Sequence, residues 1–335
     1  MKPAEVKKAP VFLVSASPHV HAPGSVRTIM RDVILALLPA SAAAVYFFGL
    51  RALVLIAVSV ATCVLSERLA RRAMGRPDMT GDLSAAVTGL LLALNLPPTL
   101  PPLLAVAGGV FAIVVAKQLF GGLGYNPFNP ALAARAFLLV SFTGAMTTWT
   151  ASGWGGADAL TTATPLGTVK EALRAGGPIP FAFDSSIGWR LFLGDVNGCL
   201  GETSSLALLL GGLYLLARKV IDWRIPVSFI GTVAAYAAVL RLVSPAAAMP
   251  VPFHLFAGGL FLGAIFMATD MVTSPSTRWG QVVFGIGCGL LTMVIRTVPS
   301  GAYPEGVSFA ILIMNAFVPL IDRATRPVPF GESHA

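Results

Sequence analysis

The chain has 335 residues, of which 56% are hydrophobic and only 11% are charged. A soluble globular protein carries about 25% charged residues, so this composition excludes an ordinary soluble domain and indicates an integral membrane protein. The formal net charge is +8. In a membrane protein, an excess of Lys and Arg is typical of cytoplasmic loops rather than of nucleic-acid binding. We therefore expect an all-α polytopic protein surrounded by membrane lipid, with no nucleic acid bound.

Ten hydrophobic runs, taken in chain order, are candidate transmembrane helices. They lie at about 32–50, 52–67, 82–96, 101–118, 130–144, 203–217, 225–242, 253–269, 280–296 and 307–322. Several are short and interrupted by Pro, as at "NLPPTLPP" and "NPFNP", which indicates broken helices that line a site. We therefore expect about ten transmembrane helices, several of them broken.

The longest polar connection divides these runs into two groups of five. An odd number of helices in each group makes the second group start from the opposite side, so the two halves are expected to be inverted. A weak internal echo between "GGLGYNPFNPALAAR" and "MATDMVTSPSTRWGQ" agrees with a repeat, although the two segments are offset by one helix. The expected parts are an N-terminal arm 1–31, a first half 32–145, a loop region 146–201, a second half 202–323 and a tail 324–335.

The distribution of basic residues predicts the orientation in the membrane. With the N-terminus inside, sixteen of the 23 Lys and Arg residues fall on the cytoplasmic side, six fall outside, and Arg135 lies within the fifth run. Cytoplasmic loops carry the excess of Lys and Arg, so both termini are expected to be cytoplasmic. The loop region 146–201 then lies on the outer face.

Ionisable residues at membrane depth are candidates for function. They are Asp82, Lys117, Arg135, Glu202 and Asp270. The alternative is that they sit at helix ends, where headgroups and water solvate them, and Glu202 also suits a helix first turn. The four His and three Cys residues are scattered, which gives no metal-ligand spacing and predicts no metal site.

The outer loop contains "DALTTATPLGTVKEALRAGG", residues 158–177. Thr168 and Glu171 have the spacing of a capping box, which predicts a short helix from Thr168 to about Ala175, ending at Gly176. A helix N-terminus attracts phosphate, so this loop is suited to an anionic ligand without identifying one.

Within that stretch, the pattern Asp158-x-x-Thr161-Thr162-Ala163-Thr164 resembles the flavinylation motif D-x-x-[S/T]-G-A-[S/T] of the RnfD/NqrB family. Thr162 stands where the motif usually has Gly. Further blocks are similar to the family over nearly the whole chain, and the ending favours the RnfD branch. These blocks are "SASPHVHAPGSVRTIMRDVILALLPA", "VTGLLLALNLPP", "KQLFGGLGYNPFNPALAARAFLLVSF", "GETSSLALLLGG", "WRIP", "FMATDMVTSPST", "YPEGVSFAILIMN" and "FVPLIDRATRPVPFG".

The resemblance implies a membrane subunit of an ion-translocating ferredoxin:NAD oxidoreductase complex. FMN would be attached through its phosphate to Thr164 by a flavin transferase, and Asp158, Thr161 and Ala163 would complete the attachment motif. The flavin would relay electrons from a flavin-bearing neighbour among the other subunits, coupled to Na⁺ or H⁺ transport. A second, non-covalent flavin such as riboflavin is expected by analogy with NqrB. The location would be the bacterial inner membrane, with the FMN loop periplasmic.

Further roles remain open alternatives. Lys170 and Arg174 either favour a reduced, anionic flavin or are solvated loop charges. Phe142, Trp149 and Trp154 either stack on the flavin ring or belong to an interfacial aromatic belt.

Glu202 and Asp270 are expected on the ion path. The competing functions are a channel or secondary transporter without a redox role, and a structural anchor for other subunits.

Overall fold

The computed structural model describes residues 24–149, 164–175, 183–202, 204–244, 249–298 and 306–327. Within these ranges the chain forms helices and no strands, which confirms the all-α prediction. The helices of the first part are α1 (Val26–Phe48), α2 (Leu50–Ala73), η1 (Thr80–Asp82), α3 (Ser84–Leu94), α4 (Pro102–Val110), η2 (Phe111–Gln118), α5 (Pro130–Ser141) and α6 (Thr143–Met146). Those that follow are α7 (Pro165–Ala175), α8 (Ser185–Leu193), α9 (Ser205–Ala217), α10 (Arg224–Val243), α11 (Val251–Phe256), α12 (Leu260–Leu262), η3 (Gly263–Met267), α13 (Arg278–Thr297) and α14 (Val307–Thr325).

Five helices are long and apolar enough to cross a membrane by length and composition, namely α1, α2, α10, α13 and α14. Shorter apolar helices accompany them, at Ser84–Leu94, Pro102–Gln118, Pro130–Ser141 and Ser205–Ala217. The chain is therefore a multi-pass membrane protein.

Side-chain caps explain where several of these helices begin. The hydroxyl of Ser25 accepts a hydrogen bond from the Thr28 N–H at the start of α1. Asn129 accepts from two backbone N–H groups at the start of α5, and Pro130 follows it at the first helical position. Both arrangements satisfy N–H groups that a helix leaves unpaired at its N-terminus. The polar break "NPFNP" therefore starts a helix at its second Asn-Pro pair.

Two helix interruptions lie against the segment before α9. The break after α3 accepts hydrogen bonds from the segment before α9, from Gly201 N to Leu94 O at 2.7 Å and from Leu200 N to Leu96 O at 3.0 Å. The second interruption separates α11 from α12 at Gly258, whose φ of +75° favours glycine. These breaks place backbone polar groups and short loops inside the bundle.

The two segments of the internal echo have a common local structure. "GGLGYNPFNPALAAR" follows the π-helix η2, and "MATDMVTSPSTRWGQ" overlaps the end of the π-helix η3. π-Helical turns are rare and frequently occur at functional sites. The echo noticed in the sequence therefore extends to the helices in front of each segment.

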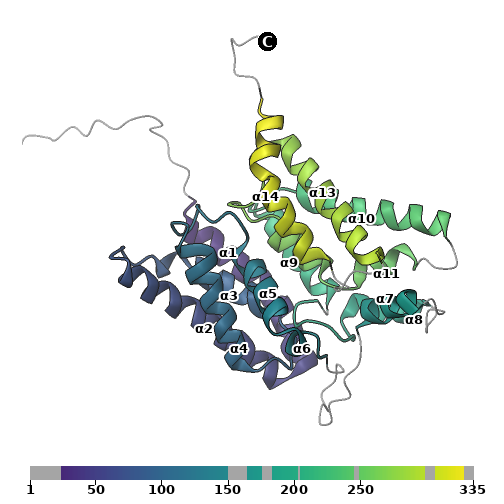
Figure 1. Ribbon diagram of the computed structural model, residues 1–335, viewed down its shortest axis with the longest axis horizontal. Helices are drawn as coiled ribbons and strands as arrows, with labels where there is room; N and C mark the ends of the chain where they lie inside the picture. The colour runs from purple at the N-terminus through teal and green to yellow at the C-terminus, as the bar shows by residue number, and fades with distance from the viewer. Residues whose placement is uncertain are drawn as a thin grey trace, which may run out of the picture.

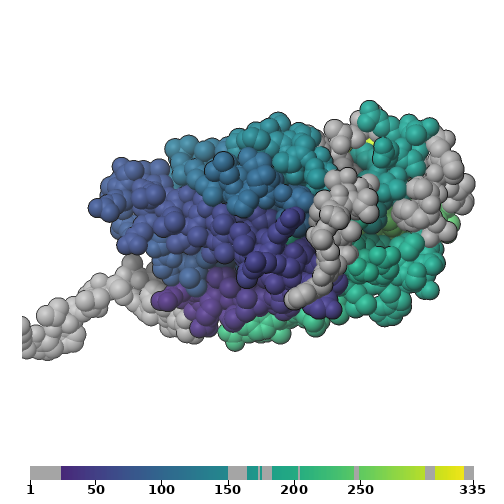
Figure 2. All heavy atoms as spheres, turned by 90° about the horizontal axis from the view of Figure 1, so that it is seen from below, coloured from purple at the N-terminus to yellow at the C-terminus, as the bar shows by residue number. Residues whose placement is uncertain are grey.

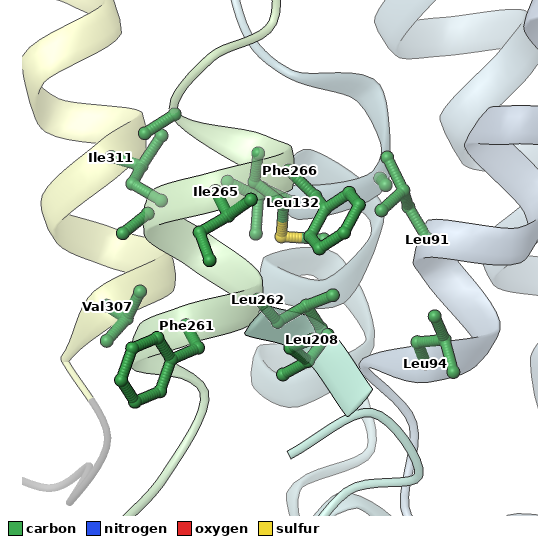
Figure 3. Close-up of a cluster of buried hydrophobic side chains, with 14 of the residues drawn as sticks. Leu91, Leu94, Leu132, Leu208, Phe261, Leu262, Ile265, Phe266, Val307 and Ile311 are labelled. Carbon is green, nitrogen blue, oxygen red and sulfur yellow. The ribbon is translucent and has the colours of Figure 1, made fainter. Parts of the chain in front are cut away.

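Apolar side chains from several helices form one core. Figure 3 shows part of it, where residues of α3, α5, α9, α12, η3 and α14 point toward one another; those labelled are Leu91, Leu94, Leu132, Leu208, Phe261, Leu262, Ile265, Phe266, Val307 and Ile311. Around it, α1 contacts α9, α2 contacts α3 and α4, and α13 lies between α10 and α14. In Figure 1, α14 runs toward the upper edge, whereas α6, α7 and α8 lie at the lower edge.

A smaller cluster of buried residues supports the two short helices α7 and α8. It contains Leu166 and Val169 of α7, Leu191 of α8, and Phe253 of α11. Seen from below, the first part of the chain lies on one side of the molecule, and the teal residues of α7 and α8 lie on the other (Figure 2). The described helices of the polar connection, α7 and α8, thus form a packed platform at one end.

Candidate functional site

Thr164 stands at the start of the platform helix α7. Its hydroxyl oxygen accepts a hydrogen bond from the backbone N–H of Gly167 at 3.1 Å, and Pro165 occupies the first helical position. This is the arrangement of an N-cap residue followed by proline. The side chain is 7% exposed, so it lies between the helix end and the body of the protein.

The predicted N-cap of this helix is wrong by four residues, because Thr164 and not Thr168 is the cap. We expected Thr168 to cap the helix, but Thr168 lies within α7, where its N–H and its hydroxyl both bond to the carbonyl oxygen of Thr164. The capping-box spacing of Thr168 and Glu171 competes with the Thr164-Pro165 pair. The earlier start wins because proline fixes a helical φ and lacks the N–H that a helix start leaves unpaired.

Thr164 shares a narrow recess with Glu202. The recess has a volume of about 10 Å³ and is lined by Thr164, Pro165, Leu166, Leu191, Val196, Asn197, Gly198, Glu202 and Gly258. A Cβ at Gly198 or Gly259 would lie 3.2 or 3.3 Å from a carboxylate oxygen of Glu202. The carboxylate is therefore enclosed by backbone that approaches closely because these positions are glycine.

Glu202 forms an ion pair with Arg135, and the position of neither residue in the sequence predicts this contact. Arg135 Nη2 lies 3.5 Å from Glu202 Oε1, and both side chains are buried. The guanidinium also donates to Asn95 Oδ1 and to Ser308 Oγ, each at 2.9 Å. Arg135 thus joins α5, the break after α3, the start of α14 and the segment before α9.

Glu202 is not fully satisfied by this pairing. Its Oε1 accepts no hydrogen bond from the described residues, while its Oε2 lies 3.5 Å from the Cys199 N–H. A buried carboxylate normally uses its acceptor capacity, so this one has a lone-pair site left beside Thr164. The interpretation of Glu202 as a first-turn dipole partner is wrong, because α9 begins only at Ser205 and Glu202 instead forms a long-range ion pair.

The two basic residues of α7 differ in burial. Lys170 is 8% exposed, and its Nζ donates to the carbonyl oxygen of Ile295 at the end of α13 at 2.8 Å. Burial lowers the pKa of Lys170 from its ordinary value, because the charged form is desolvated. Arg174 is exposed. Of the two alternatives for these residues, a solvated loop charge describes Arg174 and not Lys170.

Asp270 lies apart from this site. It borders another cavity of about 110 Å³, together with Lys117, Ser84 and Asn129 among others. Its carboxylate accepts hydrogen bonds from the Val272 N–H and the Thr273 hydroxyl. The two proposed ion-path residues, Glu202 and Asp270, therefore border different cavities.

A second buried ion pair was not anticipated from the sequence. Lys117 Nζ donates to Glu67 Oε1 at 2.7 Å and to Ser84 Oγ at 2.6 Å, and Gln118 Nε2 also donates to Glu67 at 2.8 Å. Glu67 ends one hydrophobic run and therefore resembles a solvated helix-end residue in sequence. The sequence feature that could have singled out Glu67 is its position one helical turn before the basic residues Arg71 and Arg72.

Other residues singled out in the sequence have less definite places. Asp158, Thr161, Thr162, Ala163 and Trp154 lie outside the described residues, so their predicted roles stay predictions. Phe142 is 38% exposed, and Trp149 is half-buried. In the part of the chain that the structure describes, no three His, Cys, Asp or Glu residues are grouped to hold a metal ion.

The comparison with known proteins gives one consistent result. The family model for NQR2, RnfD and RnfE matches residues 13–331. The D subunit of the proton-translocating ferredoxin:NAD(+) oxidoreductase complex of Clostridium ljungdahlii is 46% identical over 99% of both chains. The Na(+)-translocating counterpart from Acetobacterium woodii is 47% identical over 95% of both chains. The D subunit of the ion-translocating oxidoreductase complex of Stutzerimonas stutzeri is 45% identical over 92% of this chain and 93% of its own. The chain belongs to the NQR2, RnfD, RnfE family.

Proposed function

We propose that this protein is the D subunit of an ion-translocating ferredoxin:NAD oxidoreductase complex, and that it carries FMN covalently on Thr164. Support comes from relatives that are named as D subunits of such complexes and that align over nearly the whole chain. The proposal implies further subunits of the complex as partners, one of them a flavin-bearing neighbour that passes electrons to this one. A flavin transferase would attach the FMN.

The observation that carries the FMN proposal is the position of Thr164 at the N-terminus of α7. A phosphate bound to its hydroxyl oxygen would lie at the positive end of an eleven-residue helix, whose first N–H groups are suited to an anion. The residues present therefore fit a phosphoester at this position. Bound FMN would supply electron transfer.

The residues around Thr164 would position and tune that group. The N–H of Gly167 already points at the Thr164 oxygen, and the cation of Lys170 lies on the same helix, buried against α13. Glu202 borders the same recess as Thr164 and is paired with Arg135. Its negative charge would offset part of the positive charge near the attachment oxygen of Thr164. These residues would bind, orient and electrostatically stabilise an anionic group.

The membrane arrangement forms part of the proposal. Ten helical segments would cross or enter the bilayer in two inverted halves, with both termini in the cytoplasm and Thr164 on the periplasmic face of the inner membrane. The excess of basic residues in the predicted cytoplasmic loops supports this orientation. It also agrees with the placement of α7 and α8 at the opposite end of the bundle from the end of α14 (Figure 1).

Glu202 and Asp270 are the acidic residues proposed for the path of Na⁺ or H⁺, one bordering each cavity. A second, non-covalent flavin such as riboflavin is proposed as an additional cofactor, on the family resemblance alone. Asp158, Thr161 and Ala163 are proposed to be read by the transferase together with Thr164.

The test is a comparison of two threonine variants. The chain is co-expressed with the flavin transferase, denatured, run on a gel and viewed for flavin fluorescence. Thr164→Val should abolish the fluorescent band, because the attachment oxygen is removed. Thr168→Val, one helical turn further along α7, is the matched control and should leave the band unchanged.

The possible results separate the competing functions. A fluorescent band that persists in Thr164→Val would refute the assignment of the anchor. The absence of covalent flavin from the wild-type chain purified with its native complex would refute the redox proposal and favour a channel or transporter.

A further inference from the structure

A third cavity, distinct from the one that Asp270 borders, lies against α7 beside the recess that contains Thr164. Its volume is about 170 Å³, and its lining residues are Leu166, Val169, Lys170, Leu240, Ser244, Met249, Phe253, His254, Arg296 and Thr297. Apolar side chains from α7, α10 and α11 form most of its wall. The polar groups come from α7, the C-cap of α10, α11 and the end of α13, so the cavity combines an apolar wall with basic side chains.

His254 is the first sign that this cavity takes a polar ligand. The side chain is 6% exposed, and neither ring nitrogen has a hydrogen-bond partner among the described residues. Burying an unpaired polar group costs about 1–3 kcal/mol, so such groups normally have partners. An imidazole that lines a cavity with both nitrogens unpaired is suited to a ligand that has hydrogen-bond donors and acceptors.

The charges around the cavity favour an acceptor over a donor. Lys170 and Arg296 line it, and none of its lining residues in the described part of the chain carries a carboxylate. Arg296 is held in place by the carbonyl oxygens of His254 at 2.6 Å and Ala257 at 3.1 Å. The neighbouring carboxylate, Glu202, lies in the adjacent recess and is paired with Arg135. A ligand that is electron-rich or carries negative charge is therefore preferred.

The cavity also lies where a group attached to Thr164 would need room. The recess at Thr164, at about 10 Å³, has space for only one water molecule. Leu166 borders both the recess and the cavity, and it is two residues from Thr164. A Cβ at Gly258 would lie 2.7 Å from Leu166 Cδ1 and 3.1 Å from Arg296 Nη2. A side chain at this position would therefore clash with residues that lie between the recess and the cavity.

We propose that this cavity receives the pyrimidine edge of the flavin ring, with Lys170 and His254 facing its carbonyl oxygens and its N–H. The inference rests on the proposed attachment of FMN to Thr164. One electron from the flavin-bearing neighbour proposed above would leave one negative charge on the ring, with no bond formed and no proton moved. Lys170 and Arg296, both buried, would stabilise that charge and thereby favour reduction.

The test is a redox titration of the covalent flavin in the purified complex, followed by its absorption spectrum. Lys170→Gln removes one buried charge, and Arg174→Gln is the matched control, with the same charge change on the exposed side of the same helix. We expect Lys170→Gln to lower the equilibrium constant for one-electron reduction by about tenfold, which is ~59 mV. Arg174→Gln should leave the constant unchanged.

Two further variants keep the test decisive if Lys170→Gln does not assemble. Lys170→Arg keeps the charge and should titrate like the wild type, whereas His254→Phe keeps the bulk but removes the hydrogen-bonding nitrogens and should also disfavour reduction. If Lys170→Gln and Arg174→Gln have the same equilibrium constant for one-electron reduction, with covalent flavin present in both, the placement of the flavin ring in this cavity is wrong. The attachment to Thr164 would not be affected by that result. Fluorescence that survives Thr164→Val would instead overturn the anchor on which it rests.

Discussion

Two buried ion pairs in the part of the chain that the structure describes differ in how completely they are enclosed. Lys117 and Glu67 meet at 2.7 Å and are each 2% exposed at the side chain, with Ser84 and Gln118 bonded to them. Arg135 and Glu202 meet at 3.5 Å, beside the recess that contains Thr164. The first pair joins α2 to η2, and the second joins α5 to the segment before α9, far along the sequence.

The difference indicates separate roles. A short, densely bonded pair is suited to holding helices together, because its desolvation cost is offset by several hydrogen bonds. Each of the two carboxylates has one oxygen without a hydrogen-bond partner among the described residues, so the pairs differ in distance and in place. The looser pair lies next to a candidate anchor and is suited to adjusting the charge there. The second pair is therefore the one expected to influence a ligand on Thr164.

The largest expected effect comes from breaking the first pair. Lys117→Met leaves the Glu67 carboxylate buried without its cation, which should destabilise the fold by about 3–5 kcal/mol. The measurement is the midpoint of thermal unfolding of the detergent-solubilised chain. The double variant Lys117→Met/Glu67→Met should recover most of the loss, and a single variant as stable as the wild type would contradict a structural role for this pair.

Breaking the second pair should cost less and should change the flavin. Glu202→Gln leaves Arg135 with its bonds to Asn95 and Ser308, so we expect a loss of about 1–3 kcal/mol. The added positive charge near Thr164 should raise the midpoint potential of the covalent flavin. Asp270→Asn, which borders the other cavity, is the control and should not move that potential; equal shifts in both variants would remove the distinction between the two regions.

A smaller effect is expected at the glycine that separates the recess from the cavity. Gly258 has φ +75°, and a Cβ there would contact Leu166 at 2.7 Å. Gly258→Ala should cost about 1–2 kcal/mol from the left-handed backbone and should also displace α7. Attachment efficiency, measured as fluorescence per protein, should fall; Gly231→Ala, where a Cβ meets nothing within 4 Å, should leave it unchanged.

The smallest effect is expected at the exposed cap of α8, the helix that supplies Leu191 to the recess. Asp184 accepts hydrogen bonds from the Ile187 N–H and the Ser186 hydroxyl, and these bonds hold its pKa below the ordinary value. A lowered carboxyl pKa stabilises the helix at neutral pH, and that contribution disappears as the pH falls through the lowered pKa. Hydrogen exchange should therefore speed up in α8 in Asp184→Asn at pH 7, and the wild type should approach the variant in acid.

The helices were largely predictable from the sequence because apolar runs and Pro-Asn breaks act locally. All ten runs contain helical segments, and the cap at Asn129 lies at the Asn-Pro pair noted in the sequence. The start of α7 was not predicted, since two local capping patterns competed within five residues. In that case proline at the first helical position favoured Thr164 over Thr168.

Only the site residue that belongs to a sequence motif could be assigned a role from the sequence. Thr164 followed from the family resemblance, and Glu202 and Arg135 were noticed separately as ionisable residues in apolar surroundings. That they form a pair could not be read from the chain, because 67 positions separate them and the contact depends on tertiary packing. Lys170 and Arg174 look alike in sequence, and only the packing of α7 on α13 buries one and exposes the other.

The most direct measurement is peptide mass spectrometry of the chain purified from its native membrane. After proteolysis, the peptide that contains residues 158–174 should carry the mass of FMN less one water, and fragmentation should place it on Thr164. Attachment at Thr161, Thr162 or Thr168, or an unmodified peptide from a complex active in electron transfer, would contradict the account.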